Sequence, residues 1–309
     1  MIDIKKSKHD IILNTTTFCN YNCSYCDVVK DKKNLDYQTL NNLIIFLKNN
    51  SDKINKIKFF WWEPLLVFEN IKCIIKNSKD LIGNNYEIVT NTSILNDEIW
   101  EYFNKYFKTI FFSIDSENKF NYEKVYEFIE KFELHDKIYF NLVINPWTED
   151  FSYFQYEKIY KYWYKKFNIL PVYYTKIWTK ENLQNLSYFM KKILDNSIIE
   201  KDIKLYWFQD NSWYNKSLIN NSIFIDYDWK IYLSDIICTN IWKTLKKDLY
   251  LWSIDNYNMN DTLILSLKQN ILNNFEKQIS KNIWWQDKLH EIMDYFSKYL
   301  NTQKWIIKD

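Results

Sequence analysis

Hydrophobic positions along the first two thirds of the chain follow two alternating patterns. Short apolar and β-branched runs, which are typical of buried strands, occur at residues 11–13, 54–60, 86–89, 108–112, 137–144 and 169–174. Apolar residues at helical spacing occur at residues 35–48, 71–79, 96–107, 122–132, 154–167 and 181–194. Strands that alternate with helices of this length imply parallel pairing with right-handed crossovers. The pattern therefore predicts the α/β class and an open (βα)6 partial TIM barrel.

The pattern changes after about residue 200. Two alternating runs, at residues 223–225 and 231–233, predict a hairpin around Asp228 and Trp229. Further strands are expected at residues 204–208 and 249–254, and two final helices at residues 261–275 and 287–300. We therefore expect a core domain at residues 1–200 and a small α+β extension at residues 201–309.

Composition narrows the class of protein. The chain has 309 residues, 47% of them hydrophobic, which excludes disorder and is enough for a sizeable core. The net charge of +2, with Lys as the only basic residue besides His, makes nucleic acid an improbable partner. No apolar stretch is long enough to cross a membrane, and no signal-peptide core follows the N-terminus. Five cysteines, three of them clustered, indicate a metal site in a reducing compartment, so we expect a cytoplasmic protein.

The clustered cysteines, Cys19, Cys23 and Cys26, directly follow the first predicted strand. A loop of this kind can surround a metal centre, because its ligands converge within eight residues. Both a tetrahedral zinc ion and an iron–sulfur cube require four ligands. The spacing therefore implies either a fourth ligand from elsewhere or a coordination site that is left open. A zinc loop, or cysteines that only pack, remain alternatives.

The C-x3-C-x2-C pattern, with Tyr25 directly before the third cysteine, resembles the cluster loop of radical S-adenosylmethionine (SAM) enzymes. The resemblance implies that Cys19, Cys23 and Cys26 hold a [4Fe–4S] cluster whose fourth iron binds SAM. It also implies reductive cleavage of SAM to a 5′-deoxyadenosyl radical that abstracts hydrogen from a substrate. An electron donor such as flavodoxin or ferredoxin is then expected as a partner.

A second segment, Trp61-Trp62-Glu63-Pro64, follows the second predicted strand. If both Trp residues are read as Gly, it resembles the Gly-Gly-Glu-Pro signature of the same family. There the glycines allow the backbone to approach the methionyl group of SAM. Two indoles would fill that space. An ordinary solvated turn is the alternative for Glu63.

Polar residues also end the third and fourth predicted strands. Thr90-Asn91-Thr92 is similar to the family's Thr-Asn-Gly turn, and Ser113 and Asp115 match positions that contact the ribose of SAM. The fifth strand ends near the adenine in this family, so we expect residues 143–144 to line that pocket. The resemblance thus implies cofactor-binding positions at Trp61, Trp62, Glu63, Asn91, Ser113 and Asp115.

The glycine content is unusual. The chain has one Gly and 14 Trp, whereas Gly averages about 7% of residues in globular proteins. Several Trp occupy places where a turn normally has Gly, namely Trp61, Trp62, Trp147, Trp229 and Trp252. We hypothesise that these codons are UGA and are read as glycine by the native ribosome. The alternative is a Trp-rich protein with bulky turns, which is sterically unfavourable wherever φ is positive.

The C-terminal extension bears on the substrate. Its hairpin and the run at residues 249–254 resemble the SPASM/twitch-like extension of the peptide- and protein-modifying branch. With Cys238 as its only cysteine, the extension cannot hold a full auxiliary cluster. We therefore expect a peptide or protein side chain as substrate. A small metabolite or a tRNA nucleotide is the enzymatic alternative, and a non-catalytic zinc- or cluster-binding protein is the other.

Overall fold

The structure is a computed structural model. It describes residues 8–26, 28, 30–114, 121–145, 149–162, 164–172, 179–200, 204–205, 222–228, 230–232, 250–253, 259 and 264.

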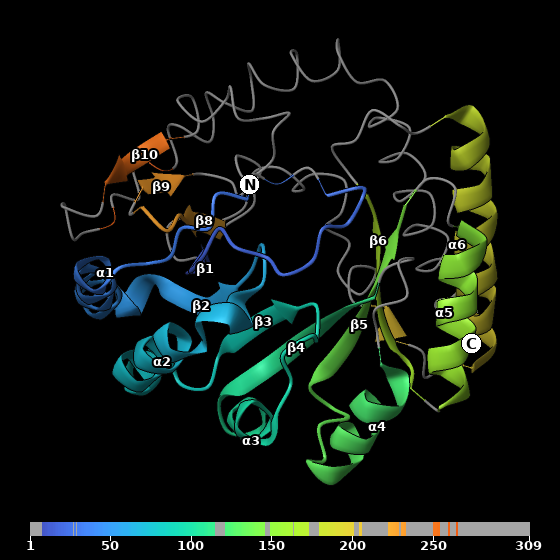
Figure 1. Ribbon diagram of the computed structural model, residues 1–309, viewed down its shortest axis with the longest axis horizontal. Coiled ribbons are helices and arrows are strands. Elements are labelled where there is room, and N and C mark those ends of the chain that lie inside the picture. The colour runs from blue at the N-terminus through green and yellow to red at the C-terminus, as the bar shows by residue number, and fades with distance from the viewer. Residues whose placement is uncertain are drawn as a thin grey trace, which may run out of the picture.

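Across these residues the strands form a single twisted sheet in the order β10-β9-β8-β1-β2-β3-β4-β5-β6-β7 (Figure 1). The strands are β1 (His9–Leu13), β2 (Ile54–Phe59), β3 (Tyr86–Thr90), β4 (Phe107–Ile114), β5 (Ile138–Ile144), β6 (Lys166–Pro171), β7 (Lys204–Leu205), β8 (Ser222–Ile225), β9 (Lys230–Tyr232) and β10 (Tyr250–Ser253). Neighbours from β8 through β1 to β7 are parallel, and β9 and β10 pair antiparallel. The sheet curves without closing, which confirms the open partial barrel.

Helices connect successive strands and cover the convex side of the sheet (Figure 1). They are α1 (Tyr37–Asn49), α2 (Phe68–Ile82), α3 (Asp97–Tyr106), α4 (Tyr122–Lys131), α5 (Glu149–Lys161) and α6 (Lys180–Glu200), with short 3₁₀ helices at Ser51–Lys53 and Pro64–Val67. Side chains of Asp36, Asn96 and Asn121 cap α1, α3 and α4 by accepting a backbone N–H of the first turn. These caps fix where the helices begin.

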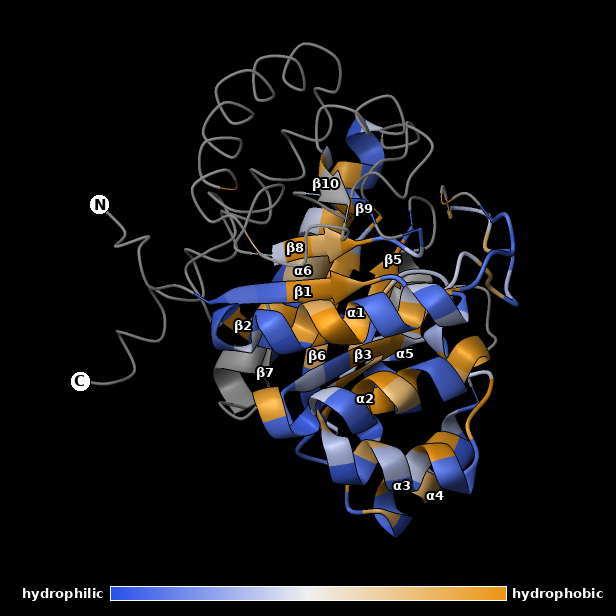
Figure 2. Ribbon diagram, turned by 90° about the vertical axis from the view of Figure 1, so that its left-hand side faces the viewer, coloured by the Kyte–Doolittle hydropathy of each residue, from blue (hydrophilic) through white to orange (hydrophobic). Residues whose placement is uncertain are grey.

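The hydrophobic core lies between the sheet and this helical layer. Trp100 of α3 has no exposed surface and stacks on Phe128 and Phe132, with ring centroids 5.2 and 6.3 Å away. On the sheet side, the ring centroids of Phe59 and Phe107 lie 6.1 Å apart. Figure 2 shows hydrophobic and hydrophilic positions alternating along α1 and α2, as expected of helices with one buried face.

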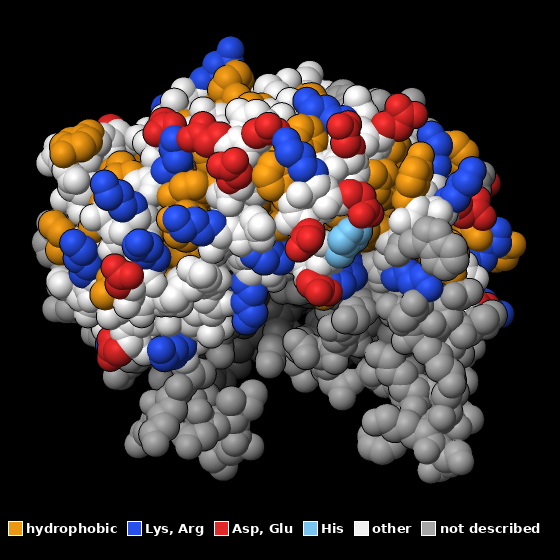
Figure 3. Space-filling view, turned by 90° about the horizontal axis from the view of Figure 1, so that it is seen from below, with side chains coloured by type: hydrophobic (Ala, Val, Ile, Leu, Met, Phe, Trp, Pro, Cys, Tyr) orange, Lys and Arg blue, Asp and Glu red, His pale blue; other side chains and the backbone are white. Residues whose placement is uncertain are grey.

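The outer surface carries both signs of charge. Figure 3 shows Lys side chains interspersed with Asp and Glu on the face seen from below. This mixture agrees with the small net charge of +2. Among the helices that the structure describes, none combines the length and the apolar character needed to cross a bilayer.

Most of the expected elements are confirmed, but both ends of the predicted helix 154–167 are wrong, because α5 begins at Glu149. The predicted helix 154–167 ends at Lys161. The strand that was expected at residues 169–174 begins at Lys166, three residues earlier than predicted. Aromatic residues around Tyr160 continue the helical spacing, but pairing of Phe167 with β5 overrides it. The predicted hairpin is confirmed as β8 and β9, and the run at 249–254 as β10. The two final helices lie outside the described residues except for Ile264, and the strand at 204–208 is described only as β7.

Candidate functional site

A cavity of about 210 Å³ opens at the carboxyl ends of the parallel strands, which is the edge where ligands bind in parallel α/β folds. The cysteine loop forms one wall and the strand ends form the other. Its lining residues are Cys19, Tyr21, Cys23, Tyr25, Cys26, Val28, Phe60, Trp61, Trp62, Val89, Thr90, Asn91, Ser113 and Val143. The structure thus brings together the three predicted ligands and four of the six predicted cofactor-binding residues.

The three cysteines of this wall, Cys19, Cys23 and Cys26, form no disulfide and are partly exposed to the cavity. Burial raises the pKa of the Cys19 thiol above its ordinary value. Over the described part of the chain, no group of three or more His, Cys, Asp or Glu side chains converges as a preformed metal site. The donor set still fits an iron–sulfur centre with an open position, because three thiols face one cavity and thiolates are its usual ligands.

The cysteine loop leaves and re-enters the fold through a hydrogen-bonded stem, which the sequence did not predict. Thr17 N donates to the Lys33 carbonyl at 2.7 Å, and Lys33 N donates to Thr17 Oγ1 at 2.8 Å. Leu35 N donates to the Thr15 carbonyl at 3.1 Å. Inside the loop, Lys30 Nζ donates to the Tyr21 carbonyl at 2.8 Å. The stem comprises residues 14–18 and 31–35.

Glu63 is fully buried and lies behind the cavity wall, not on it. Its Oε1 accepts Leu65 N at 3.0 Å and Thr90 Oγ1 at 2.9 Å, and its Oε2 accepts Asn91 N at 2.7 Å. Its own N–H donates to the Phe18 carbonyl at 3.2 Å. Burial raises the pKa of Glu63 to about 7, although these donors act in the opposite direction. Glu63 therefore holds the end of β3 through its side chain and the start of the cysteine loop through its backbone N–H, and the solvated-turn alternative is wrong.

Trp61 and Trp62 adopt backbone conformations that favour glycine. Their φ angles are +72° and +48°, and Thr92, at the predicted Gly position of the next strand end, has φ of +65°. Left-handed backbone costs an L-residue roughly 1–2 kcal/mol. Both indoles line the cavity, with ring centroids of Phe60 and Trp61 4.9 Å apart. These angles support glycine at positions 61 and 62. Trp147 and Trp229 lie outside the described residues, and Trp252 lies in β10.

Some of the remaining predicted site residues line the cavity, and the others do not line it or lie outside the described residues. Asn91 lines the cavity, and its Nδ2 lies 3.7 Å from Cys19 Sγ and 3.0 Å from Asn20 Oδ1. Ser113 and Val143 line the cavity from β4 and β5. Ile144 is fully buried and is absent from the lining, because side chains alternate between the two faces of β5. Asp115 lies outside the described residues.

These features define a partial-barrel protein whose three-cysteine loop faces a ligand cavity. A profile of the Radical SAM superfamily matches residues 13–139. Over 121 residues the chain is 32% identical to the radical SAM cyclopropyl synthase TigE of Paramaledivibacter caminithermalis (33% of this chain, 26% of that protein). Over 98 residues it is 40% identical to an uncharacterized protein of Methanocaldococcus jannaschii (30% of this chain, 34% of that protein). The chain thus matches about a third or less of the length of these relatives.

Solved structures share the fold at low sequence identity. AnSMEcpe with bound AdoMet superposes with a TM-score of 0.66 at 13% identity, covering 83% of this chain and 80% of that one. Streptococcus suis SuiB bound to the precursor peptide SuiA superposes with a TM-score of 0.57 at 15% identity, covering 75% and 60%. The sequence match to the radical SAM superfamily thus extends over residues 13–139, and the solved structures show that the fold is shared. The cofactors of that superfamily are a [4Fe–4S] cluster and SAM.

Proposed function

We propose that the protein is a radical SAM enzyme in which Cys19, Cys23 and Cys26 hold a [4Fe–4S] cluster and SAM occupies the adjoining cavity. The observation that carries the proposal is the single cavity lined by all three thiols and by the carboxyl ends of four neighbouring strands. When bound, the cluster and SAM supply a one-electron cleavage that yields a 5′-deoxyadenosyl radical. The chain's own part is to hold, orient and shield them.

Residues on the strand side have distinct proposed roles. Three thiolates leave one iron open for the amino and carboxylate groups of SAM. Ser113 offers a hydroxyl to the ribose, and Val143 offers an apolar surface to the adenine; both line the cavity. Asn91 orients the loop next to Cys19 through its amide. Asp115 is kept as a predicted ribose contact.

Positions 61–63 would support the methionyl group. With glycine at positions 61 and 62, the backbone after β2 could approach the ligand without an intervening side chain. Glu63 acts from behind the wall, because its carboxylate fixes the backbone N–H of Asn91. The aromatic rings of Tyr25 and Phe60 line the same cavity and would keep water away from the reacting centre.

The proposed substrate is a peptide or protein side chain. The structural similarity to SuiB, which has been solved with a precursor peptide, supports this class, as does that to anSMEcpe, which has been solved with AdoMet and a peptide. A small-molecule substrate is the alternative. A flavodoxin- or ferredoxin-type donor is the proposed reductant, and the cytoplasm is the proposed compartment.

The test uses the full chain, encoded with Gly at 61 and 62 and reconstituted anaerobically with iron and sulfide. We expect 5′-deoxyadenosine from SAM under a strong reductant. Cys26→Ala is the control and should abolish both the cluster and the product. A cluster-loaded protein that forms no product above this control would contradict the proposed activity.

A second candidate function is a zinc- or cluster-stabilised binding protein without radical chemistry. The observation that favours it is that Trp61 and Trp62, as printed, place two indoles on the cavity wall. The comparison is the same reconstitution with Trp at both positions. Tightly held zinc, no cluster and no product in both forms would favour the binding protein.

A further inference from the structure

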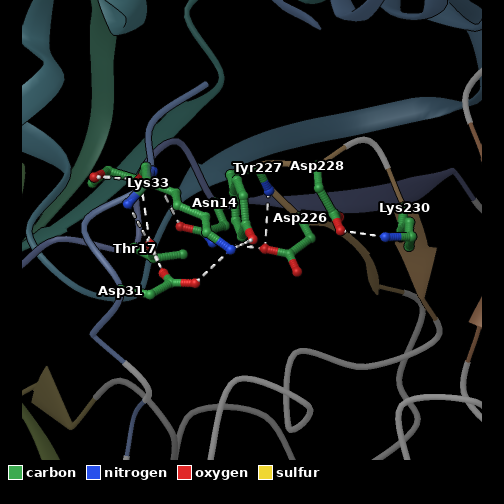
Figure 4. Close-up of polar contacts among 9 residues, drawn as sticks. Asn14, Thr17, Asp31, Lys33, Asp226, Tyr227, Asp228 and Lys230 are labelled. Carbon is green, nitrogen blue, oxygen red and sulfur yellow. Dashed lines mark hydrogen bonds and ion pairs between the residues drawn. The ribbon is translucent and has the colours of Figure 1, made fainter. Parts of the chain in front are cut away.

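A polar contact joins the C-terminal hairpin to the stem of the cysteine loop (Figure 4). Asn14 Nδ2 donates to Asp226 Oδ1 at 2.8 Å, across 212 positions of sequence. Asn14 has no exposed surface and Asp226 is 4% exposed. Asn14 directly follows β1, and Asp226 directly follows β8. The contact therefore links the two parallel strands at the edge where the cysteine loop begins.

Both polar atoms of the Asn14 side-chain amide form hydrogen bonds. Its Oδ1 accepts Thr16 N at 3.3 Å, and its backbone N–H donates to the Ile225 carbonyl at 2.9 Å. Asp226 Oδ1 also accepts Tyr227 N at 2.9 Å, and Asp226 N donates to the Lys230 carbonyl at 3.0 Å. A buried amide and carboxylate that share several partners hold one geometry, because each broken bond leaves a desolvated polar group.

A weaker contact reinforces the first on the outer side of the stem. Lys33 Nζ lies 3.3 Å from Tyr227 Oη and 3.0 Å from Asp31 Oδ2 (Figure 4). Thr17 Oγ1 donates to the same Asp31 carboxylate. The Lys33 side chain is 57% exposed, and exposed ion pairs contribute little to stability. The Asn14–Asp226 pair is therefore the contact that positions the stem.

We propose that Asn14 and Asp226 are positioning residues, through which the C-terminal hairpin sets the placement of the cysteine loop against the SAM cavity. The inference rests on the proposed radical SAM function and extends it to residues that touch neither cofactor. Cys19 follows Asn14 by five residues, and the hydrogen-bonded stem moves as a unit. A shift of the stem would therefore displace all three thiols together relative to Ser113 and Asn91 on the opposite wall.

Exchanging the two side chains tests this pairing. Asn14→Asp places a second carboxylate against Asp226, so repulsion should open the contact. Asp226→Asn keeps an oxygen acceptor for both donors and should be mild. The double variant Asn14→Asp/Asp226→Asn restores one donor and one acceptor between the positions, but the amide NH2 that then faces the carboxylate at position 14 cannot accept Tyr227 N. Asp228→Asn is the matched control, because Asp228 lies on the same turn but forms an ion pair with Lys230 instead of the stem.

The first measurement is the rate of 5′-deoxyadenosine formation per reconstituted cluster. For Asn14→Asp we expect kcat to fall about tenfold or more, because misplacement by about 1 Å can cost a hundredfold. KM for SAM should stay within about twofold, since neither residue lines the cavity. The double variant should recover part of the rate, because the direct contact returns while the Tyr227 N–H loses its acceptor, and Asp228→Asn should match the wild type. Reduced iron content with an unchanged rate per cluster would overturn the proposal, because the pair would then only aid folding.

The second measurement is independent of activity. Backbone hydrogen exchange should become faster across residues 18–31 in Asn14→Asp, including the Cys26 N–H that donates to the Cys23 carbonyl at 3.1 Å. Exchange in α3, on the far side of the core, should not change. Equal acceleration in both segments, or in neither, would overturn the positioning role. A wild type that holds its cluster but does not cleave SAM would refute the proposed activity instead, and the exchange result would still decide the positioning role.

Discussion

Glycine at positions 61 and 62 should restore the cavity at little cost in stability. At these positions φ is +72° and +48°, so returning the indoles to glycine relieves roughly 1–2 kcal/mol of strain per residue. Against this, the greater backbone freedom of glycine in the unfolded chain costs roughly 0.5–1 kcal/mol per residue. Both indoles are only partly buried against the core, and each loses at most about 1.5–3 kcal/mol of apolar burial. At the midpoints of these ranges the net cost is at most about 1.5 kcal/mol per residue.

Trp100→Gly is the matched control. Trp100 is fully buried in helix α3 and stacks on Phe128 and Phe132. Its removal should cost about 3–5 kcal/mol for the cavity and about 1 kcal/mol more for glycine within a helix. The same chemical change should therefore cost several times more free energy at position 100 than at position 61 or at position 62.

The assay compares urea unfolding of the Trp form, the double glycine form and Trp100→Gly, together with SAM affinity by calorimetry. We expect the double glycine form to lose at most about 3 kcal/mol of unfolding free energy relative to the Trp form and to bind SAM more tightly. A loss as large as that of Trp100→Gly, with no gain in SAM affinity, would refute the reasoning. Mass spectrometry of the native protein checks the codon hypothesis directly, since glycine and indole masses differ at each site.

Three further predictions concern the neighbouring strand ends and the loop. Glu63 has a pKa of about 7 in the fold against an ordinary value of 4.5. Its contribution to the free energy of unfolding is therefore complete below about pH 4.5 and is lost as the pH rises through about 7. The difference in pKa corresponds to a loss of about 3 kcal/mol. Glu63→Gln should remove this slope in urea unfolding at a series of pH values. Cys26→Ala should lose iron after reconstitution, whereas Cys73→Ala, on α2 and outside the cavity, should retain it. Thr92→Gly, at φ +65°, should leave the melting temperature unchanged or higher, whereas Thr90→Gly should lower it, because buried Thr90 donates to Glu63.

Each of these predictions has a contradicting result. An unchanged pH slope in Glu63→Gln would mean that the buried carboxyl is ionised in the fold at the same pH as in the unfolded chain. Equal iron loss from Cys26→Ala and Cys73→Ala would contradict the assignment of the cysteine loop as the ligand of the cluster. A melting temperature that falls equally in Thr92→Gly and Thr90→Gly would show that positive φ at position 92 carries no strain.

Periodicity was sufficient for most of the fold because neighbouring βα units are local in sequence. Residues 86–89, for example, were expected as a strand and form most of β3, which is buried at every position, and Asn96 caps α3 as its residue type predicts. The boundary between α5 and β6 failed because aromatic residues satisfy both periods. There the choice is made by pairing with β5, and spacing within one segment carries no information about that pairing.

The site was predictable where function constrains adjacent residues and not where contacts are distant. The three cysteines and Ser113 were found from local motifs, and all of them line the cavity. The burial of the Glu63 side chain was not predicted. It depends on three hydrogen-bond donors, which the 3₁₀ helix directly after Glu63 and the end of β3 provide. The Asn14–Asp226 pair lies 212 positions apart, so no single-sequence pattern links the two residues.

The position of β1 explains why the extension and the cysteine loop are connected. β1 pairs with β2 on one side and with β8 on the other, both in parallel register. Without β8, β1 would be an edge strand with unpaired backbone groups, and the buried amide of Asn14 would lose its acceptor. The loop that bears the proposed cluster ligands starts from this strand. The hairpin therefore completes the sheet next to the start of this loop, and a change in the extension can reach the thiols through the β1–β8 pairing and the Asn14–Asp226 contact.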